Sequence, residues 1–272
     1  MQTSLHRPAR IDSPLLQFRK NVTSQCGEDG IIAHIANTLQ VANKFCVEFG
    51  AWDGVHYSNC FNLLTNNAWR GVMIEANVEK YGELVKTYRD RMNVTTVNKF
   101  VDFEGPNSLD RILTELQAPR DFGLLSIDID GNDFYIWESL VNHAPEIIVI
   151  EFNPTVPNDV VFVQEKSFLV NQGCSLLALI GLGKQKGYEL AACTDWNAFF
   201  VKSENLAKLG VQDNSIDRLY APVQDGRIFQ GYDGSVHVVG MDRLLWRNMP
   251  LSSEDFQVLP RALRVFEDAQ RK

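Results

Sequence analysis

The stretch FCVEFGAWDG, residues 45–54, decides the fold class because a short apolar strand runs directly into a glycine turn. Apolar runs of this kind recur along the chain, each separated from the next by a helical stretch of roughly ten residues. The predicted strands are 45–49, 71–75, 94–101, 124–129, 147–152, 188–193 and 198–202. The helices between them are predicted around 58–67, 81–91, 108–116, 134–142 and 175–186. This alternation predicts a Rossmann-like α/β fold, with a mostly parallel seven-stranded sheet and helices on both faces.

The chain of 272 residues divides into three predicted segments. Residues 1–22 are polar and contain two prolines, which indicates an N-terminal arm leading into a helix capped by Ser24. Residues 23–203 carry the alternating pattern and form the main domain. Residues 204–272 are expected to form a C-terminal extension packed on the same domain, with a hairpin around 232–235 and a closing helix over 252–272 interrupted at Pro260. Whether this extension covers the sheet edge or forms a homodimer contact stays open.

The composition disfavours several classes of partner. The 26 Lys and Arg against 34 Asp and Glu give a net charge of −8, which disfavours binding to nucleic acid. No stretch approaches the roughly 18 apolar residues of a membrane span, and no secretory signal begins the chain. The five cysteines contain no CxxC pair, which argues against a zinc ribbon and for a reducing, cytoplasmic compartment. We therefore expect a cytoplasmic protein that acts on a small molecule.

Carboxylates follow the first five predicted strands, and no Lys or Arg does. Ligands of open parallel sheets bind beyond the carboxyl ends of the strands, so these residues define the expected site. The turn with Gly50 and Gly54 lacks the GxGxxG pattern of nicotinamide enzymes and the lysine of a P-loop. Glu48 and Asp53 suit a ligand with an ammonium and a sulfonium, and Glu75 suits two ribose hydroxyls. These are the requirements of S-adenosylmethionine; the alternative is a glycine turn with solvated acids.

Four runs of the sequence resemble FkbM-type methyltransferases. These are SQCGEDGII (24–32), CVEFGAWDGVHYSNC (46–60), NNAWRGVMIEAN (66–77) and LLSIDIDGNDFYIWESL (124–140). The resemblance implies a class I S-adenosylmethionine-dependent methyltransferase fold over residues 24–153, and O-methylation of a hydroxyl on a sugar or another small metabolite. It also implies that Glu48, Gly50 and Gly54 line the methionine moiety, Glu75 the ribose and Asp102 the adenine. The predicted cofactor site comprises Glu48, Gly50, Asp53, Gly54, Glu75, Asn77, Asp102 and Asp128.

The fourth strand departs from that family pattern. Family members more usually end it in Asp-Val-Glu-Gly, whereas residues 128–131 read Asp-Ile-Asp-Gly, so the second acid is shorter. Asp128 and Asp130 share one face of the strand, as do Glu151 and Asn153 on the next. Such a set of oxygen ligands suits Mg²⁺ and is similar to metal-dependent O-methyltransferases of the catechol type, in which the metal binds vicinal hydroxyls. The alternative is that Asp128 contacts the cofactor while Asp130 caps the following helix.

Two further groups complete the predicted site. His56 is a candidate general base for the hydroxyl proton, alongside Asp128, although a lone histidine also suits a purely structural role. The segment 153–171 is expected to form a long loop over the active edge, and such loops often close over a substrate. The candidate substrate contacts are Tyr57, Asp133, Gln164, Asn171 and Gln172. The rival functions are a non-methylating enzyme on the same fold and a cofactor-binding module without catalysis.

Overall fold

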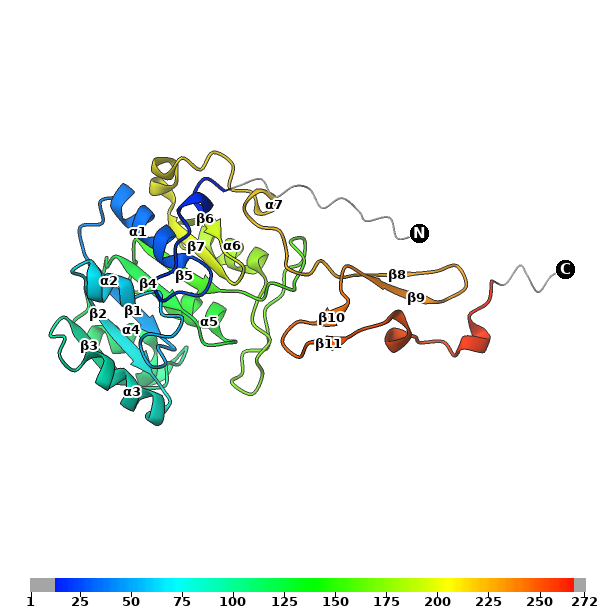
Figure 1. The fold of residues 1–272 in the computed structure, drawn as a ribbon, viewed down its shortest axis with the longest axis horizontal. Coiled ribbons are helices and arrows are strands. Elements are labelled where there is room, and N and C mark those ends of the chain that lie inside the picture. Colours follow the sequence, from blue (N-terminus) through cyan, green and yellow to red (C-terminus); the bar gives the residue numbers. More distant parts are fainter. Residues whose placement is uncertain (1–12, 267–272) are drawn as a thin grey trace.

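A computed structural model describes residues 13–266 and places a seven-stranded sheet at the centre of the protein (Figure 1). The strands run in the order β3-β2-β1-β4-β5-β7-β6, and only β7 is antiparallel to the rest. Their bounds are β1 Phe45–Phe49, β2 Arg70–Glu75, β3 Val94–Asn98, β4 Leu124–Ile127, β5 Ile147–Glu151, β6 Tyr188–Cys193 and β7 Asn197–Lys202. This order with an antiparallel β7 is the Rossmann-like arrangement of class I methyltransferases, which confirms the predicted fold.

The helices are α1 Glu28–Thr38, α2 Phe61–Asn66, α3 Val78–Tyr88, α4 Leu109–Glu115, α5 Asp133–Ser139, α6 Leu176–Gln185 and α7 Ile216–Leu219. Helices α2 to α6 lie between the strands as the alternation predicts, α1 precedes β1, and α7 follows β7. Every residue of β1 and of β4 is buried, as expected for strands covered by helices on both faces. Helix α3 begins three residues earlier than predicted, because the side chain of Asn77 accepts hydrogen bonds from the first-turn amides of Glu79 and Lys80.

The sheet changes direction between β1 and β4. The chain builds outward from β1 to β3 and then crosses back to place β4 beside β1, so the carboxyl ends of these two strands form a topological switch point. Gly50 follows β1 there with a φ of +72°, and a Cβ on it would lie 2.0 Å from the carbonyl oxygen of Asp128. Only glycine allows the two turns to approach this closely.

The N-terminal arm packs against α1 over its described part. Leu15 is fully buried, a 3₁₀ turn spans Leu16–Phe18, and the ring of Phe18 stacks on His34 at 3.5 Å between centroids. The predicted cap at Ser24 is displaced: α1 begins at Glu28, after Gly27, although the Ser24 hydroxyl still accepts a hydrogen bond from the amide of Asp29. Residues 1–12 of the predicted arm lie outside the described residues.

The C-terminal extension has two parts. Residues 203–220 pack on the sheet domain through Leu209, Leu219 and Tyr220, all buried. From residue 227 the chain projects away from the sheet as two hairpins (Figure 1), β8 Arg227–Gln230 with β9 Val236–Val239 and β10 Arg243–Leu244 with β11 Met249–Pro250. The predicted hairpin around 232–235 is confirmed.

The predicted closing helix is wrong over its described part. Residues 252–266 contain only two short 3₁₀ turns, Ser253–Phe256 and Arg261–Leu263. Pro260 has no amide hydrogen and disfavours helical geometry at the residue before it, and no residue of either turn is buried in a core that would stabilise a longer helix. The segment 267–272 lies outside the described residues.

No helix within residues 13–266 combines the length and apolar character that crossing a membrane requires.

Candidate functional site

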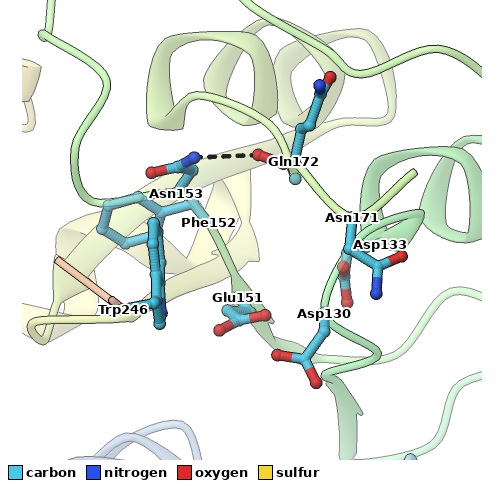
Figure 2. A pocket seen from close by; sticks show the side chains of 9 residues that line it. Asp130, Asp133, Glu151, Phe152, Asn153, Asn171, Gln172 and Trp246 are labelled. Atoms are coloured by element: carbon cyan, nitrogen blue, oxygen red, sulfur yellow. Dashed lines mark hydrogen bonds between the residues drawn. The ribbon is translucent and has the colours of Figure 1, made fainter. Parts of the chain in front are cut away.

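A cavity of about 270 Å³ opens at the carboxyl ends of β4 and β5 (Figure 2). Its walls come from the turn after β4, the end of β5, the loop that follows β5 and the C-terminal extension. The lining residues are Asp130, Asp133, Glu151, Phe152, Asn153, Asn171, Gln172, Gly173 and Trp246. Three carboxylates and three amides face this space without a single Lys or Arg, so the cavity suits a hydroxyl-rich or cationic ligand.

Three carboxylates converge beside the cavity, and two of them, Asp130 and Glu151, line it. Oxygen atoms of Asp128, Asp130 and Glu151 all lie within 4.8 Å of one another. Burial, together with the charges of Asp133 and Asp130, raises the pKa of Asp128 to about 8. Burial and the charge of Asp128 also raise the pKa of Glu151. The cluster therefore relieves its repulsion by holding a proton near neutral pH or by holding a cation.

The turn after β4 is shaped by Asp133, the first residue of α5. Its buried carboxylate accepts hydrogen bonds from the amides of Ile129 and Gly131, both at 2.9 Å. Between these two anchors Asp130 adopts a left-handed φ of +56°, and its side chain lies at the cavity beside Glu151 (Figure 2). Asp133, a predicted substrate contact, thus lines the cavity, while its oxygens are engaged in holding the turn.

Asn153, the predicted fourth metal ligand, is directed elsewhere. Its Oδ1 accepts hydrogen bonds from the amide of Thr155 at 3.0 Å and from the Thr155 hydroxyl at 2.6 Å. Its Nδ2 donates to the carbonyl oxygen of Gln172 (Figure 2). The amide of Asn153 fastens the start of the loop to its end, and the structure brings together only the three carboxylates of the predicted four-ligand set.

Glu48 is a buried residue that positions the chain rather than a free acceptor. Its two carboxylate oxygens accept hydrogen bonds from the Ser58 hydroxyl at 2.5 Å and the Asn59 amide at 2.8 Å. Burial raises the pKa of Glu48 although these bonds lower it. Glu48 therefore ties the segment before α2 to the end of β1.

The turn after β1 uses its other predicted residues locally. A Cβ on Gly54 would lie 2.6 Å from side-chain atoms of Leu84 and Tyr88, so Gly54 serves close packing on α3 rather than the switch point. Asp53 accepts hydrogen bonds from the amides of Val55 and His56. Burial opposes the shift, but these bonds hold the pKa of Asp53 below its usual range.

Glu75 lies buried at the end of β2, where a ribose contact is predicted. Its carboxylate accepts hydrogen bonds from the amides of Trp52 at 2.8 Å and of Asn77 at 2.7 Å. It thereby links the turn after β1 to the turn before α3, and each oxygen keeps a second lone pair. Asp102 follows β3, half-buried, and accepts a hydrogen bond from the amide of Phe103.

The remaining predicted residues divide into two groups. His56 and Tyr57 are exposed, with ring centroids 3.9 Å apart, and neither lines the cavity. Gln164 is buried and makes hydrogen bonds to the backbone of the loop and to the side chain of Asn132 before α5. The loop has no helix or strand between β5 and α6, as predicted. Asn171 and Gln172, predicted as substrate contacts, line the cavity.

Sequence reasoning missed Trp246. This residue belongs to the segment between β10 and β11, lines the cavity opposite Asp130 and Asn171 (Figure 2), and lies 6.0 Å from Trp196 between ring centroids. A tryptophan in an extension of weak periodicity is the only signal that the sequence offers, and it does not indicate which part of the sheet the segment approaches.

The comparisons with known proteins find remote structural likenesses. No protein-family model and no curated protein matches the chain. The N-terminal domain of EvdMO1, solved in the presence of SAH and D-fucose, is 11% identical over 64% of this chain and 80% of its own, with a TM-score of 0.43. A SAM dependent methyltransferase from Aquifex aeolicus is 10% identical over 70% of this chain and 92% of its own, with a TM-score of 0.38. The putative methyltransferase yhhF from Escherichia coli is 12% identical over 67% and 88%, with a TM-score of 0.40.

Proposed function

We propose that this protein is an S-adenosylmethionine-dependent methyltransferase of the FkbM type that methylates a hydroxyl group of a sugar or another small metabolite. The observation that carries the proposal is the place of Glu75. It lies buried at the end of the second strand of a sheet ordered β3-β2-β1-β4-β5-β7-β6, beside the switch point. The runs that resemble FkbM-type methyltransferases lie within residues 24–140, and they include both the turn after β1 and Glu75.

The chemistry of the strand ends supports the cofactor. Glu75 would hold the ribose hydroxyls, Asp102 would face the adenine, and the turn at Gly50 would carry the methionine moiety. A cofactor with phosphate groups suits this edge poorly, because Glu48, Glu75 and Asp128 would repel it. When bound, S-adenosylmethionine supplies an electrophilic methyl group on a sulfonium.

The cavity beside the switch point supports the assignment of the acceptor. Asn171 and Gln172 can orient hydroxyl groups, and Phe152 and Trp246 give one side of the cavity an apolar surface. The pair of Asp128 and Glu151, with raised pKa values, is poised to accept the proton of the reacting hydroxyl when one member is ionised. We infer that this pair, rather than the exposed His56, is the general base.

A divalent cation is the second candidate for this role. The observation that favours it is the convergence of Asp128, Asp130 and Glu151, whose oxygens lie within 4.8 Å of one another. Hard oxygen ligands suit Mg²⁺, and a cation held there would lower the pKa of a bound hydroxyl. Asn153 takes no part in this proposal, because Thr155 holds its amide oxygen.

Calorimetric titration with S-adenosylmethionine and S-adenosylhomocysteine tests the cofactor. We expect binding in the micromolar range, weakened by about 1–3 kcal/mol in Glu75→Ala. Glu79→Ala, a change on the nearby first turn of α3, is the matched control and should bind like the wild type. Glu75→Gln keeps one oxygen that can accept a backbone hydrogen bond, so it replaces Glu75→Ala in this test if that variant does not fold. Failure of the wild type to bind either ligand would overturn the proposal.

Product analysis separates methyl transfer from the rival reactions. Stoichiometric S-adenosylhomocysteine with a hydroxyl-bearing acceptor supports methyl transfer, whereas consumption of the acceptor without it indicates a non-methylating enzyme. Repeating the assay with EDTA and with Mg²⁺ tests the cation. A Mg²⁺ effect that is lost in Asp130→Asn supports the second candidate, and full activity in EDTA rejects it.

A further inference from the structure

A second open space lies at the opposite edge of the sheet, where β1, β2 and β3 begin. This groove has a volume of about 740 Å³ and is lined by Lys44, Arg70 and Arg91 together with the amides of Asn43, Asn66 and Asn93. No carboxylate lines it. The groove therefore has the opposite character to the cavity at β4 and β5, whose lining contains three carboxylates and no basic residue.

The topology explains why these cations gather. Lys44 immediately precedes β1, Arg70 is the first residue of β2, and Arg91 stands three residues before β3. Parallel strands start at the same edge, and the register pairs Phe45 with Arg70. The three basic side chains are therefore neighbours in space although 47 sequence positions separate the first from the last.

Two of the exposed cations contact the protein surface beside the groove. The guanidinium of Arg70 lies 5.6 Å from the ring centroid of Phe45, and Nη1 of Arg91 donates to the carbonyl oxygen of Thr65 at 3.3 Å. Within residues 13–266, no carboxylate forms an ion pair with Lys44, Arg70 or Arg91. In a chain of net charge −8, three uncompensated cations in one groove make a local positive site.

We propose that this groove binds a phosphate-bearing small molecule, separately from the methyl-transfer site. The planar forks of two arginines match phosphate oxygens in bidentate geometry, and the ammonium of Lys44 adds a third charge. A phosphoryl group carries a charge of about −2 and can bind several cations at once. A single carboxylate carries less charge and fits a group of three cations less well. Trp69 is buried and offers little ring surface for stacking a base, so the groove recognises the phosphates themselves.

Titration of the full chain with inorganic pyrophosphate in a low-salt buffer tests this inference. We expect saturable binding at one site, weakened about tenfold by each of Arg70→Gln and Arg91→Gln. Lys44→Gln, a change at an exposed side chain, should weaken binding in the same direction without affecting folding. Arg89→Gln is the matched control, because Arg89 is exposed two residues from Arg91 and outside the groove.

Two results would overturn the inference. One is the absence of saturable pyrophosphate binding by the folded wild type. The other is an equal loss of affinity in Arg89→Gln and Arg91→Gln, which would mean general attraction to surface charge. Affinity for S-adenosylmethionine should stay unchanged in all four variants, so this test and the test of the proposed function fail independently.

Discussion

The backbone of Gly50 lies so close to the carbonyl oxygen of Asp128 that a Cβ on residue 50 would come within 2.0 Å of it. This contact joins the turns that follow β1 and β4, and it brings the predicted cofactor turn up against the carboxylate cluster. The approach leaves no room for a side chain at residue 50 between the two turns.

Gly50→Ala should therefore lower the free energy of unfolding by more than the cost of a left-handed φ at an alanine. A left-handed residue that is not glycine costs about 1 kcal/mol, and the clash with Asp128 should add about 1–3 kcal/mol. Gly210→Ala is the control, because Gly210 has a φ of +71° but no atom near the position of a Cβ. Urea unfolding of both variants measures the difference; equal losses would show that the contact with Asp128 is easily relaxed.

The carboxylate cluster should make stability depend on pH. The pKa of Asp128, about 8 in the folded protein, exceeds the value of about 3.9 for an unfolded aspartate. The folded state therefore binds more protons between these values, and the stabilisation present below about pH 4 is lost as the pH rises through 8. We expect the free energy of unfolding to fall between pH 5.5 and 8 by on the order of 2 kcal/mol more in the wild type than in Asp128→Asn.

Urea unfolding at several pH values measures this dependence. Asp90→Asn removes a highly exposed carboxylate and should leave the wild-type slope unchanged. If the cluster holds a cation, saturating Mg²⁺ should flatten the slope of the wild type, since the cation takes the place of the proton. Identical slopes in the wild type and Asp128→Asn would contradict the proposed sharing of a proton.

Gln164 should control the order of the loop after β5. Its Oε1 accepts hydrogen bonds from the amides of Gln172 and Gly173, and its Nε2 donates to Asn132 and to the carbonyl oxygen of Val170. Gln164→Ala leaves these partners unpaired. Each buried group that finds no water should lower the stability of the loop by about 1–3 kcal/mol. Hydrogen exchange over residues 164–173 should rise at least tenfold, whereas Gln172→Ala, at an exposed side chain, should leave it near the wild-type rate. Unchanged protection in Gln164→Ala would argue against this role.

Trp246 should affect the acceptor and not the cofactor. The side chain is 63% exposed, so Trp246→Ala should change the free energy of unfolding by less than about 0.5 kcal/mol. Loss of its contact with a bound ring should raise the KM of the acceptor about three- to tenfold while leaving the affinity for S-adenosylmethionine unchanged. Tyr232→Ala, at a 96% exposed ring on the other hairpin, is the control. An unchanged KM would place the acceptor elsewhere.

The alternation of apolar runs predicted the sheet well, because burial on both faces leaves a strong local signal. Each of the seven strands lies within two residues of its predicted start, and the largest error is β3, which ends at Asn98 instead of 101. The β3 strand pairs with β2 only as far as Glu75, where the side chain of Asn98 donates to the Glu75 carbonyl oxygen instead. Strand ends depend on such tertiary contacts, which periodicity does not contain.

The sequence predicted which strand ends of the candidate site meet, but not the contacts of its loop residues. Strand ends placed Asp128, Asp130 and Glu151 together correctly, because register and topology determine which ends meet. Asn153 and Gln164 were harder, since an amide in a loop binds whatever backbone the loop folds against. Trp246 reaches the cavity through an extension whose path depends on no regular pattern.

The cavity takes one of its sides from a segment that lies outside the seven-stranded sheet. The residues beyond 227 carry Trp246, whereas Glu75, Gly50 and the strand ends belong to the buried sheet. A substitution at Trp246 therefore alters one wall of the cavity without touching a buried strand. Under the proposed function, the buried sheet would hold the cofactor and the appendage would contact the acceptor, so exchanging residues 227–250 should change the acceptor and leave the affinity for S-adenosylmethionine unchanged.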